Sequence, residues 1–280
     1  MSTAVSTKAN QLSPNSGPSL AAQIGQALRD NLPPFIVLAI TWEITVQLNV
    51  FPRLLMPSLV DVAIRFWDML VSGALVKHIG ASSYRLAVGF IVGGLIGIVL
   101  GLLMGRLRRL ERFFLPLLSA LMPVPSLAWA PLFILWFGLG DLATIMVIIF
   151  SAALPTAFNT WTGVKSCNPV WLRAAESMGC RGTQLFFRVI LPSSLSMIFT
   201  GLRIGLSQSW RALVAGEMLA STDWGLGFAI FDSRQFLATD VMLVMVICIG
   251  FTGFMIVTVL FGLIEKRTVV KWGMLHEVGA

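Results

Sequence analysis

Four ionisable side chains interrupt the apolar stretches of this 280-residue chain, and they are the first candidates for chemistry. Arg203, Arg211 and Glu217 share one apolar stretch, and Glu43 lies in another. An ionisable group inside an apolar helix is costly, so it normally faces a wet cavity or a partner of opposite charge. Each of these residues therefore marks either a polar path or a structural ion pair.

Arg211 follows directly on a polar cluster near the middle of its apolar stretch. One interpretation is a path that offers a cation to an anionic solute, and the other is a structural ion pair of Arg211 with Glu43 or Glu217. Glu217 is also placed to hold the outer end of its helix, and Arg203 is close enough to the other end to extend its charge into water. The candidate path comprises Ser207, Gln208, Trp210, Arg211 and Glu217, with Ser209 beside them.

The other reactive side chains form no catalytic or metal-binding pattern. Cys167, Cys180 and Cys248 are too widely spaced for a CxxC motif, and the two histidines, His78 and His276, lie far from them. No GxxxxGK[ST] phosphate-binding loop occurs anywhere. The sequence therefore predicts no catalytic residue, cofactor, metal or ATP site, and it disfavours a membrane-embedded enzyme.

Composition and segment length predict an all-α, polytopic membrane bundle of about six transmembrane helices. Hydrophobic residues make up 56% of the chain and charged residues only 12%, about half the charged share of ordinary soluble domains. Several apolar runs approach the roughly 20 residues that a helix needs to cross a bilayer. The six runs are Pro33–Phe51, Leu86–Gly105, Phe113–Phe137, Leu142–Trp161, Met197–Leu219 and Val241–Ile264.

Two of these runs have internal features that predict their packing. In the second run, glycines recur every four residues from Gly89 to Gly105, which gives one smooth face for close contact with another helix. In the third run, Pro116, Pro123, Pro125 and Pro131 make one straight helix improbable, and a break at membrane depth is tolerated where it packs in protein or lines a wet cavity.

The expected organisation has four parts. Residues 1–31 form a partly disordered tail without a secretory signal, and residues 32–82 carry the first transmembrane helix. The same part includes an amphipathic helix from Ser58, its expected N-cap, to Leu75, which either lies on the bilayer surface or packs on the bundle. Residues 83–265 form the core with a polar loop at 163–196, and residues 266–280 form a second tail.

The basic residues predict the orientation. If six helices cross, thirteen Lys and Arg fall in one set of loops and five in the other, which places both termini in the cytoplasm. Because the +7 net charge sits in short loops and not on one face, nucleic acid is not an expected partner. The thirteen are Lys8, Arg29, Arg106, Arg108, Arg109, Arg112, Lys165, Arg173, Arg181, Arg188, Lys266, Arg267 and Lys271, and the five are Arg53, Arg65, Lys77, Arg85 and Arg234.

A polar segment, Thr162–Ser196, separates the fourth run from the fifth. Asn168 and Pro169 are typical of a helix start, and Gly179 suits the left-handed residue after a helix end, so Pro169–Met178 should be a helix. Thr183 can start a second helix to about Ile190, which Pro192 should close. A helix–turn–helix of this kind is a stiff lever that protrudes from the bundle.

This segment resembles the cytoplasmic EAA loop of ABC importer permeases, through two small residues, a glycine and a terminal Leu-Pro at matching offsets. The matching residues are Arg173, Ala174, Ala175, Glu176, Gly179, Leu191 and Pro192. From Leu86 to Trp272 the chain is similar to the nitrate, taurine and alkanesulfonate branch, through the strings MPVPSLAW, PLFILWFG, FNTW, AGEM and GLG. The family glutamate that opens the loop motif is replaced by Arg173, and Glu176 follows three residues later.

The resemblance implies a permease subunit in a bacterial inner membrane that moves a small anion, such as a sulfonate, taurine or nitrate. Its implied partners are a cytoplasmic ATPase subunit, which hydrolyses the ATP, a periplasmic solute-binding protein, membrane lipid and a second permease copy, most simply a homodimer. Aromatic carboxylates, bicarbonate and thiamine precursors remain alternative solutes. An ion-driven secondary transporter is the distant alternative, and it would have no ATPase partner.

Overall fold

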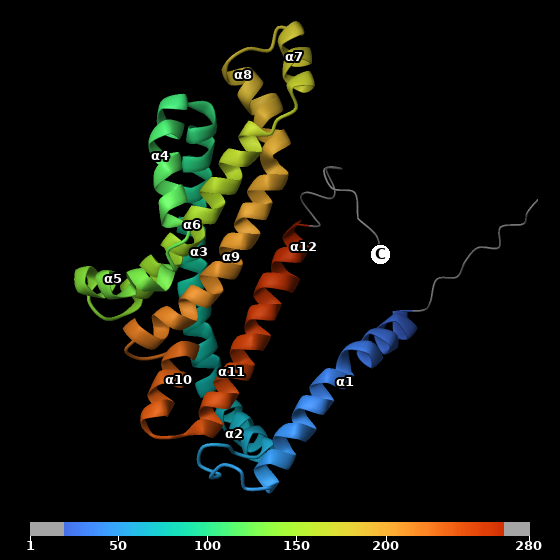
Figure 1. Cartoon of the computed structure of the whole chain (residues 1–280), viewed down its shortest axis with the longest axis vertical. Coiled ribbons are helices and arrows are strands. Elements are labelled where there is room, and N and C mark those ends of the chain that lie inside the picture. Colours follow the sequence, from blue (N-terminus) through green and yellow to red (C-terminus); the bar gives the residue numbers. More distant parts are fainter. Residues whose placement is uncertain (1–19, 266–280) are drawn as a thin grey trace, which may run out of the picture. The chain divides into compact units, whose positions relative to one another are not determined.

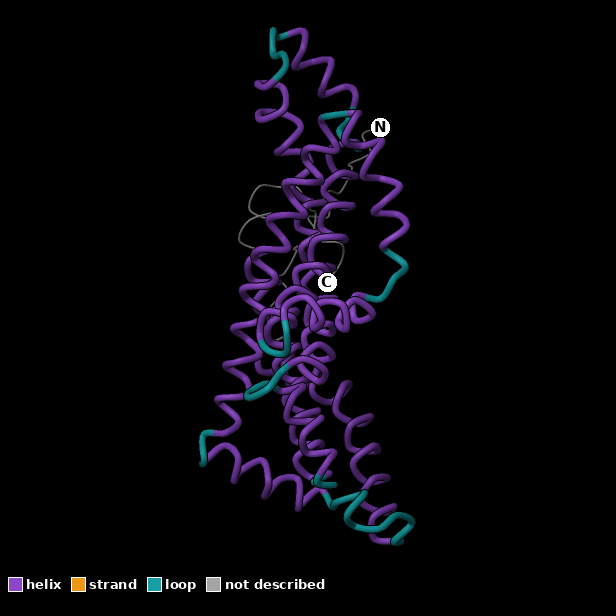
Figure 2. Tube along the Cα trace, turned by 90° about the vertical axis from the view of Figure 1, so that its left-hand side faces the viewer, coloured by secondary structure: helices purple, strands orange, loops and turns teal. Residues whose placement is uncertain are grey.

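The computed structural model describes residues 20–265, with side chains from 33 to 263. This part of the chain contains helices and no strand (Figure 2). It divides into two compact units, Met1–Leu59 and Val60–Ala280. The expected tail at 266–280 lies outside the described residues, as does residue range 1–19. Residues 20–31, which the sequence assigned to the first tail, are helical.

The first unit is built around α1 (Leu20–Gln47), a helix that contains Pro33 and Pro34. The segment after α1 folds back onto it, because the Trp42 indole donates to the carbonyl of Pro57 at 3.1 Å. The Glu43 carboxylate accepts a hydrogen bond from the backbone N–H of Leu59 at 3.2 Å. Glu43 therefore has a local role within this unit.

The second unit contains the bundle. Figure 1 shows α7 and α8 at one end of this bundle and α10 at the other. The elements are α2 (Leu59–Val71), α3 (Ala74–Arg106), α4 (Arg108–Leu121), η1 (Ser126–Trp129), α5 (Ala130–Phe137), α6 (Asp141–Lys165), α7 (Pro169–Ser177), α8 (Thr183–Leu185), η2 (Phe186–Ile190), α9 (Leu191–Ala220), α10 (Leu226–Gln235), α11 (Thr239–Phe254), η3 (Met255–Leu260) and α12 (Phe261–Glu265).

Four helical segments in the described part are long and apolar enough to cross a membrane, or five if the bent pair formed by α4 and Ser126–Phe137 counts as one span. The four segments carry the second, fourth, fifth and sixth apolar runs, and the bent pair carries the third. The first run lies in α1 and the turn after it. The bend of 96° falls between Leu121 and Ser126, where Pro123 and Pro125 remove backbone donors. The expectation that the third run is not one straight helix is confirmed.

The boundary between α2 and α3 differs from the sequence expectation. Gly73 adopts a φ of +74° and separates the two helices, so Ala74 and Leu75 belong to α3 and not to the amphipathic helix. α3 therefore starts well before Leu86, and the expected boundary at 82/83 falls inside it. A left-handed glycine ends one helix and starts the next within two residues, which periodicity alone does not reveal because both helices place apolar residues at similar spacing.

The glycine strip of α3 packs directly on α6. A Cβ at Gly97 would lie 2.7 Å from the carbonyl oxygen of Ala153 and 2.7 Å from Cβ of Thr156. Gly93 and Gly101 meet α6 in the same way one turn on either side. The absence of side chains lets the two backbones approach closely, as predicted from the spacing.

A buried polar network joins α3, α6, α9 and the start of α10 at the end of the bundle opposite α7. The Arg85 guanidinium contacts the carboxylates of Glu217 and Asp141, each at 2.7 Å. Glu217, which is fully buried, also accepts hydrogen bonds from the Ser82 hydroxyl at 2.8 Å and from Gly227 N–H at 2.9 Å. These contacts position Glu217 at the outer end of α9.

The network corrects one assignment of the orientation count. The count treats Arg85 as a loop charge, but it lies inside α3 and is only 4% exposed. The polar residues Ser82, Ser83 and Tyr84 directly before it make this part of the helix look like a loop in the sequence. Removing it from the second set of loops leaves thirteen basic residues against four (five minus one), so the asymmetry becomes larger.

The glycine contact predicts that one added methyl group destabilises the bundle at Gly97 and not at Gly80. Gly97→Ala places its Cβ against α6 backbone, and such overpacking costs about 1–3 kcal/mol. Gly80→Ala is the matched control, because it lies in the same helix and its Cβ meets nothing within 4 Å. Thermal unfolding of the purified chain should show a lower midpoint for Gly97→Ala only. Equal midpoints would contradict the close packing of α3 on α6.

The buried network predicts that loss of Arg85 is far more costly than loss of an exposed interhelical arginine. Arg85→Leu leaves the Glu217 carboxylate buried and unpaired, which costs about 3–5 kcal/mol. Arg65→Leu removes a half-exposed ion pair with Asp240, which contributes about 0–1 kcal/mol. Unfolding in denaturant compares the two, and Glu217→Gln added to Arg85→Leu should recover part of the loss. A mild Arg85→Leu phenotype would show that the ion pair is dispensable.

Candidate functional site

The segment from Asn168 to Gly182 projects from one end of the bundle, and its fold follows from its sequence. The Asn168 side chain accepts a hydrogen bond from Val170 N–H at 2.9 Å and so caps α7. At the other end, Gly179 has a φ of +83°. Its N–H bonds to the carbonyl of Glu176, and that of Cys180 bonds to Ala175. This is a Schellman motif, which requires a residue with positive φ. The predicted helix and its glycine stop are confirmed.

The base of the projecting segment is fixed to the bundle by side chains. The Arg106 guanidinium, at the end of α3, donates to the Thr183 hydroxyl at 3.3 Å and lies 5.3 Å from the ring centre of Phe186. On the other side, the Ser193 hydroxyl donates to the buried Cys167 sulfur at 3.2 Å. These contacts attach the two ends of the segment to α3 and α9.

The second helix of this segment does not end where the sequence predicted. Pro192 does not close it, because α8, η2 and α9 form one helical stretch from Thr183 to Ala220. η2 is a π-helical turn at Phe186–Ile190, directly before Leu191 and Pro192. A π-turn shifts the hydrogen-bond register, so that a proline without an N–H is tolerated inside the helix. Leu191 and Pro192 are half-buried at this joint.

The exposed surface of α7 combines apolar and charged side chains. Trp171 is 57% exposed and Met178 is 87% exposed. Arg173 and Glu176 are also exposed, and neither forms an ion pair within the described residues. Ala174 is exposed and Ala175 is half-buried, so the backbone here is open to close approach. Exposed aromatic, Met and Arg side chains are typical of protein–protein contact surfaces.

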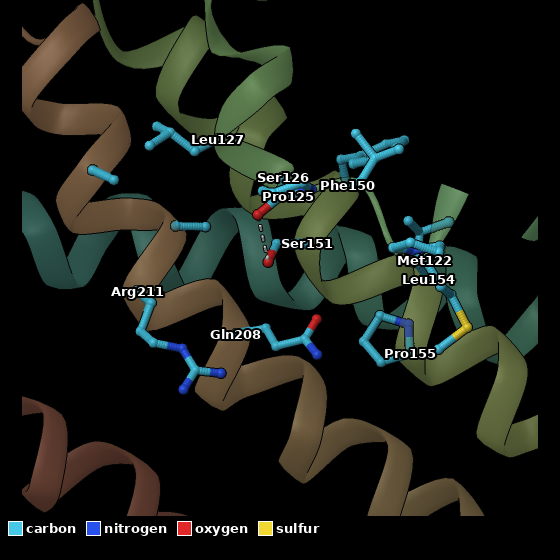
Figure 3. A pocket seen from close by; sticks show the side chains of 14 residues that line it. Met122, Pro125, Ser126, Leu127, Phe150, Ser151, Leu154, Pro155, Gln208 and Arg211 are labelled. Atoms are coloured by element: carbon cyan, nitrogen blue, oxygen red, sulfur yellow. Dashed lines mark hydrogen bonds between the residues drawn. The ribbon is translucent and has the colours of Figure 1, made fainter. Parts of the chain in front are cut away.

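A cavity of about 400 Å³ lies where the bent pair α4–α5 meets α6 and α9 (Figure 3). Its volume falls in the range of small-molecule sites. Gln208 and Arg211 project from α9, and the Ser126 hydroxyl donates to that of Ser151 at 3.3 Å. Apolar side chains complete the wall. The lining comprises Met122, Pro123, Val124, Pro125, Ser126, Leu127, Phe150, Ser151, Leu154, Pro155, Gln208, Arg211, Ala212 and Ala215.

The structure separates the candidate path residues into two groups. Gln208 and Arg211 line the cavity, and Arg211 forms no ion pair with any residue of the described chain. Trp210 is buried on the other face of α9, against Gly253 of α11. Glu217 pairs with Arg85 in the buried network. Ser207 is half-buried and does not line the cavity.

Arg211 is the only ionisable group among the cavity-lining residues. Arg211 is exposed at this cavity and the rest of the wall is apolar or neutral, so the net charge of the lining is positive and favours an anion. Within the described residues, no three His, Cys, Asp or Glu side chains gather where they could hold a metal ion. Sequence reasoning left open whether the proline break packs in protein or lines a cavity, and the bend that brings Met122–Leu127 opposite α9 shows that it lines one.

Comparisons with known proteins agree with this architecture. A protein described as a candidate aliphatic sulfonates transport permease, SsuC of Bacillus subtilis, is 33% identical over 246 residues, which cover 88% of each chain. The taurine transport system permease protein TauC of Escherichia coli is 36% identical over 186 residues, covering 66% of this chain and 67% of that protein.

A solved structure has the same fold. A chain of the MetNI methionine ABC transporter, in an inward-facing conformation, superposes with a TM-score of 0.59 at 18% identity. The match covers 72% of this chain and 97% of that chain. The sequence model for the binding-protein-dependent transport system inner membrane component matches residues 93–270, well over half of this chain. The chain therefore belongs to the family of inner-membrane components of binding-protein-dependent transport systems.

Proposed function

We propose that this chain is the permease subunit of an ATP-driven importer for a small organic sulfonate. The observation that carries the proposal is its similarity, over 66% to 88% of the chain, to relatives named for aliphatic sulfonates and taurine. In this proposal a separate cytoplasmic subunit hydrolyses ATP, and an external binding protein delivers the solute. Two copies of the chain together enclose the path.

The α7 surface is the proposed contact with the ATPase subunit. Its apolar and charged side chains are exposed, its ends are fixed by a cap and a Schellman motif, and its base is tied to α3 and α9. A rigid element of this kind transmits a displacement, whereas a flexible loop absorbs it. The asymmetry of basic residues favours a cytoplasmic location for α7 and both termini.

The cavity beside Arg211 is the proposed solute path. A sulfonate keeps its negative charge at any physiological pH, so a guanidinium that is always protonated is a suitable partner. One cation in a mostly neutral wall attracts the anion without surrounding it, which allows release. Gln208 and the Ser126–Ser151 pair supply neutral hydrogen-bonding groups for the sulfonate oxygens.

The first prediction of this proposal concerns Gly179. Valine cannot adopt the φ of +83° without strain of about 1–2 kcal/mol, so Gly179→Val should distort the turn that ends α7. That cost corresponds to a roughly five- to thirty-fold smaller share of the docking conformation. Copurification of the ATPase subunit and solute-stimulated ATP hydrolysis should both fall.

Cys180→Val is the matched control for this variant. It adds the same side chain to the next residue, which is not among those with positive φ. A well-folded Gly179→Val protein with full coupling would remove the case for α7 as the contact. Loss of coupling in both variants would point to side-chain bulk and not to backbone conformation.

The second prediction concerns Arg211. Arg211→Gln removes the cation and keeps a hydrogen-bonding side chain, so taurine uptake should fall at least tenfold while the complex assembles normally and retains basal ATPase activity. Arg211→Lys keeps the charge but loses the planar fork, and it should retain part of the uptake. If the complex with Arg211→Gln failed to assemble, this result would show instead that Arg211 has a structural role.

A further inference from the structure

A second hollow, distinct from the cavity beside Arg211, lies on the outside of the bundle between the first turns of α4 and the end of α6. It is a groove of about 560 Å³ lined by Arg108, Glu111, Arg112, Leu115, Pro116 and Lys165. Nothing in the transport mechanism uses it. Its lining changes from charged to apolar along α4, from Arg108 to Pro116.

Glu111 fixes the two walls of the groove relative to each other. Its carboxylate accepts a hydrogen bond from the Lys165 ammonium at 2.7 Å and one from the Trp161 indole at 3.2 Å. The ion pair ties α4 to the end of α6. Glu111 therefore neutralises Lys165, and the ion pairs of the described residues include neither of the other two cations of the groove.

Arg108 and Arg112 carry this excess positive charge. They are four residues apart and so share one face of α4, where like charges repel. Both are exposed, and neither forms an ion pair with a described residue. Arg109, between them, does not line the groove. With Lys165 and Glu111, the lining has three positive groups and one negative group, which suits an anion.

The side chains around the groove are typical of the edge of a bilayer. The next turn of α4 exposes Phe113 (69%) and Leu117 (47%) next to the apolar floor of Leu115 and Pro116. Trp161 lies one turn before Lys165 on α6, and tryptophan is enriched at the membrane–water interface. A polar headgroup region and an apolar chain region thus meet in one groove.

We propose that this groove binds an anionic phospholipid, with the phosphate between Arg108 and Arg112 and an acyl chain along Leu115 and Pro116. Basic pockets between membrane helices bind such headgroups. The apolar floor favours a lipid over free phosphate, and the uncompensated charge favours phosphatidylglycerol over a zwitterionic lipid. The lipid would brace the joint between α4 and α6. This site depends on membrane insertion but not on the solute or the α7 contact.

The test measures lipid binding to the purified full-length chain by native mass spectrometry and thermal unfolding. Phosphatidylglycerol, phosphatidylcholine and inorganic phosphate are added separately. The groove variant is Arg108→Gln with Arg112→Gln. The control, Arg109→Gln with Arg234→Gln, removes the same charge from exposed positions outside both the groove and the α7 segment. Arg108→Lys with Arg112→Lys keeps the charge and guards against a folding defect.

Phosphatidylglycerol should bind and raise the unfolding midpoint of the parent chain more than phosphatidylcholine does. The groove variant should bind it roughly twenty-five-fold more weakly, about fivefold for each arginine, while the control and the lysine variant retain binding. Equal binding by the groove variant and the control would overturn the proposal. If inorganic phosphate raised the unfolding midpoint as much as phosphatidylglycerol does, the groove would be a site for a simple anion and the lipid proposal would be wrong. If the groove variant bound lipid normally but copurified less ATPase subunit, the groove would be a contact for a protein partner, which would also overturn the lipid proposal.

Discussion

The close approach of α3, α6 and α9 is the constraint on which the rest of the second unit depends. In lipid, helices gain little from burying apolar side chains, so tight backbone packing must hold them together. Gly93, Gly97 and Gly101 meet α6 on one side, and a Cβ at Gly201 or Gly205 of α9 would press on Thr156 or Asn159 of α6 on the other. α6 thus packs between the small-residue faces of α3 and α9. The bend of α4–α5 and the α7 segment are attached to these three helices.

The Arg85–Glu217 network is the polar complement of that packing. A buried ion pair is retained only when its desolvation is offset by further hydrogen bonds, and here Ser82 and Gly227 supply them. The network ties the outer end of α9 to α3 and to the start of α10. At the opposite end, Arg106 and Cys167 tie the α7 segment to the same helices. Contacts at both ends of α3 and α9 thus connect the α7 segment with a cavity-lining helix and with the far end of the bundle.

Local signals predicted local structure well, whereas contacts between distant segments were beyond the sequence. The cap at Asn168, the stop at Gly179 and the break near Pro123 follow from backbone chemistry within a few residues. The burial of Arg85 does not, because its partners lie 56 and 132 residues away. Trp210 and Arg211 are adjacent but face different sides of α9, and only the positions of α11 and the bend show which one lines the cavity. Pro192 does not end the helix, because the π-helical turn η2 lies directly before it and shifts the hydrogen-bond register.

The most direct test of a permease that depends on a partner's ATP hydrolysis is taurine uptake into proteoliposomes. The vesicles contain this chain with or without the ATPase subunit, with binding protein outside and ATP enclosed. Uptake that requires both the ATPase subunit and ATP, and that a proton or sodium gradient cannot replace, is the expected result. Uptake by this chain alone, driven by an ion gradient, would contradict the proposed mechanism and identify a secondary transporter.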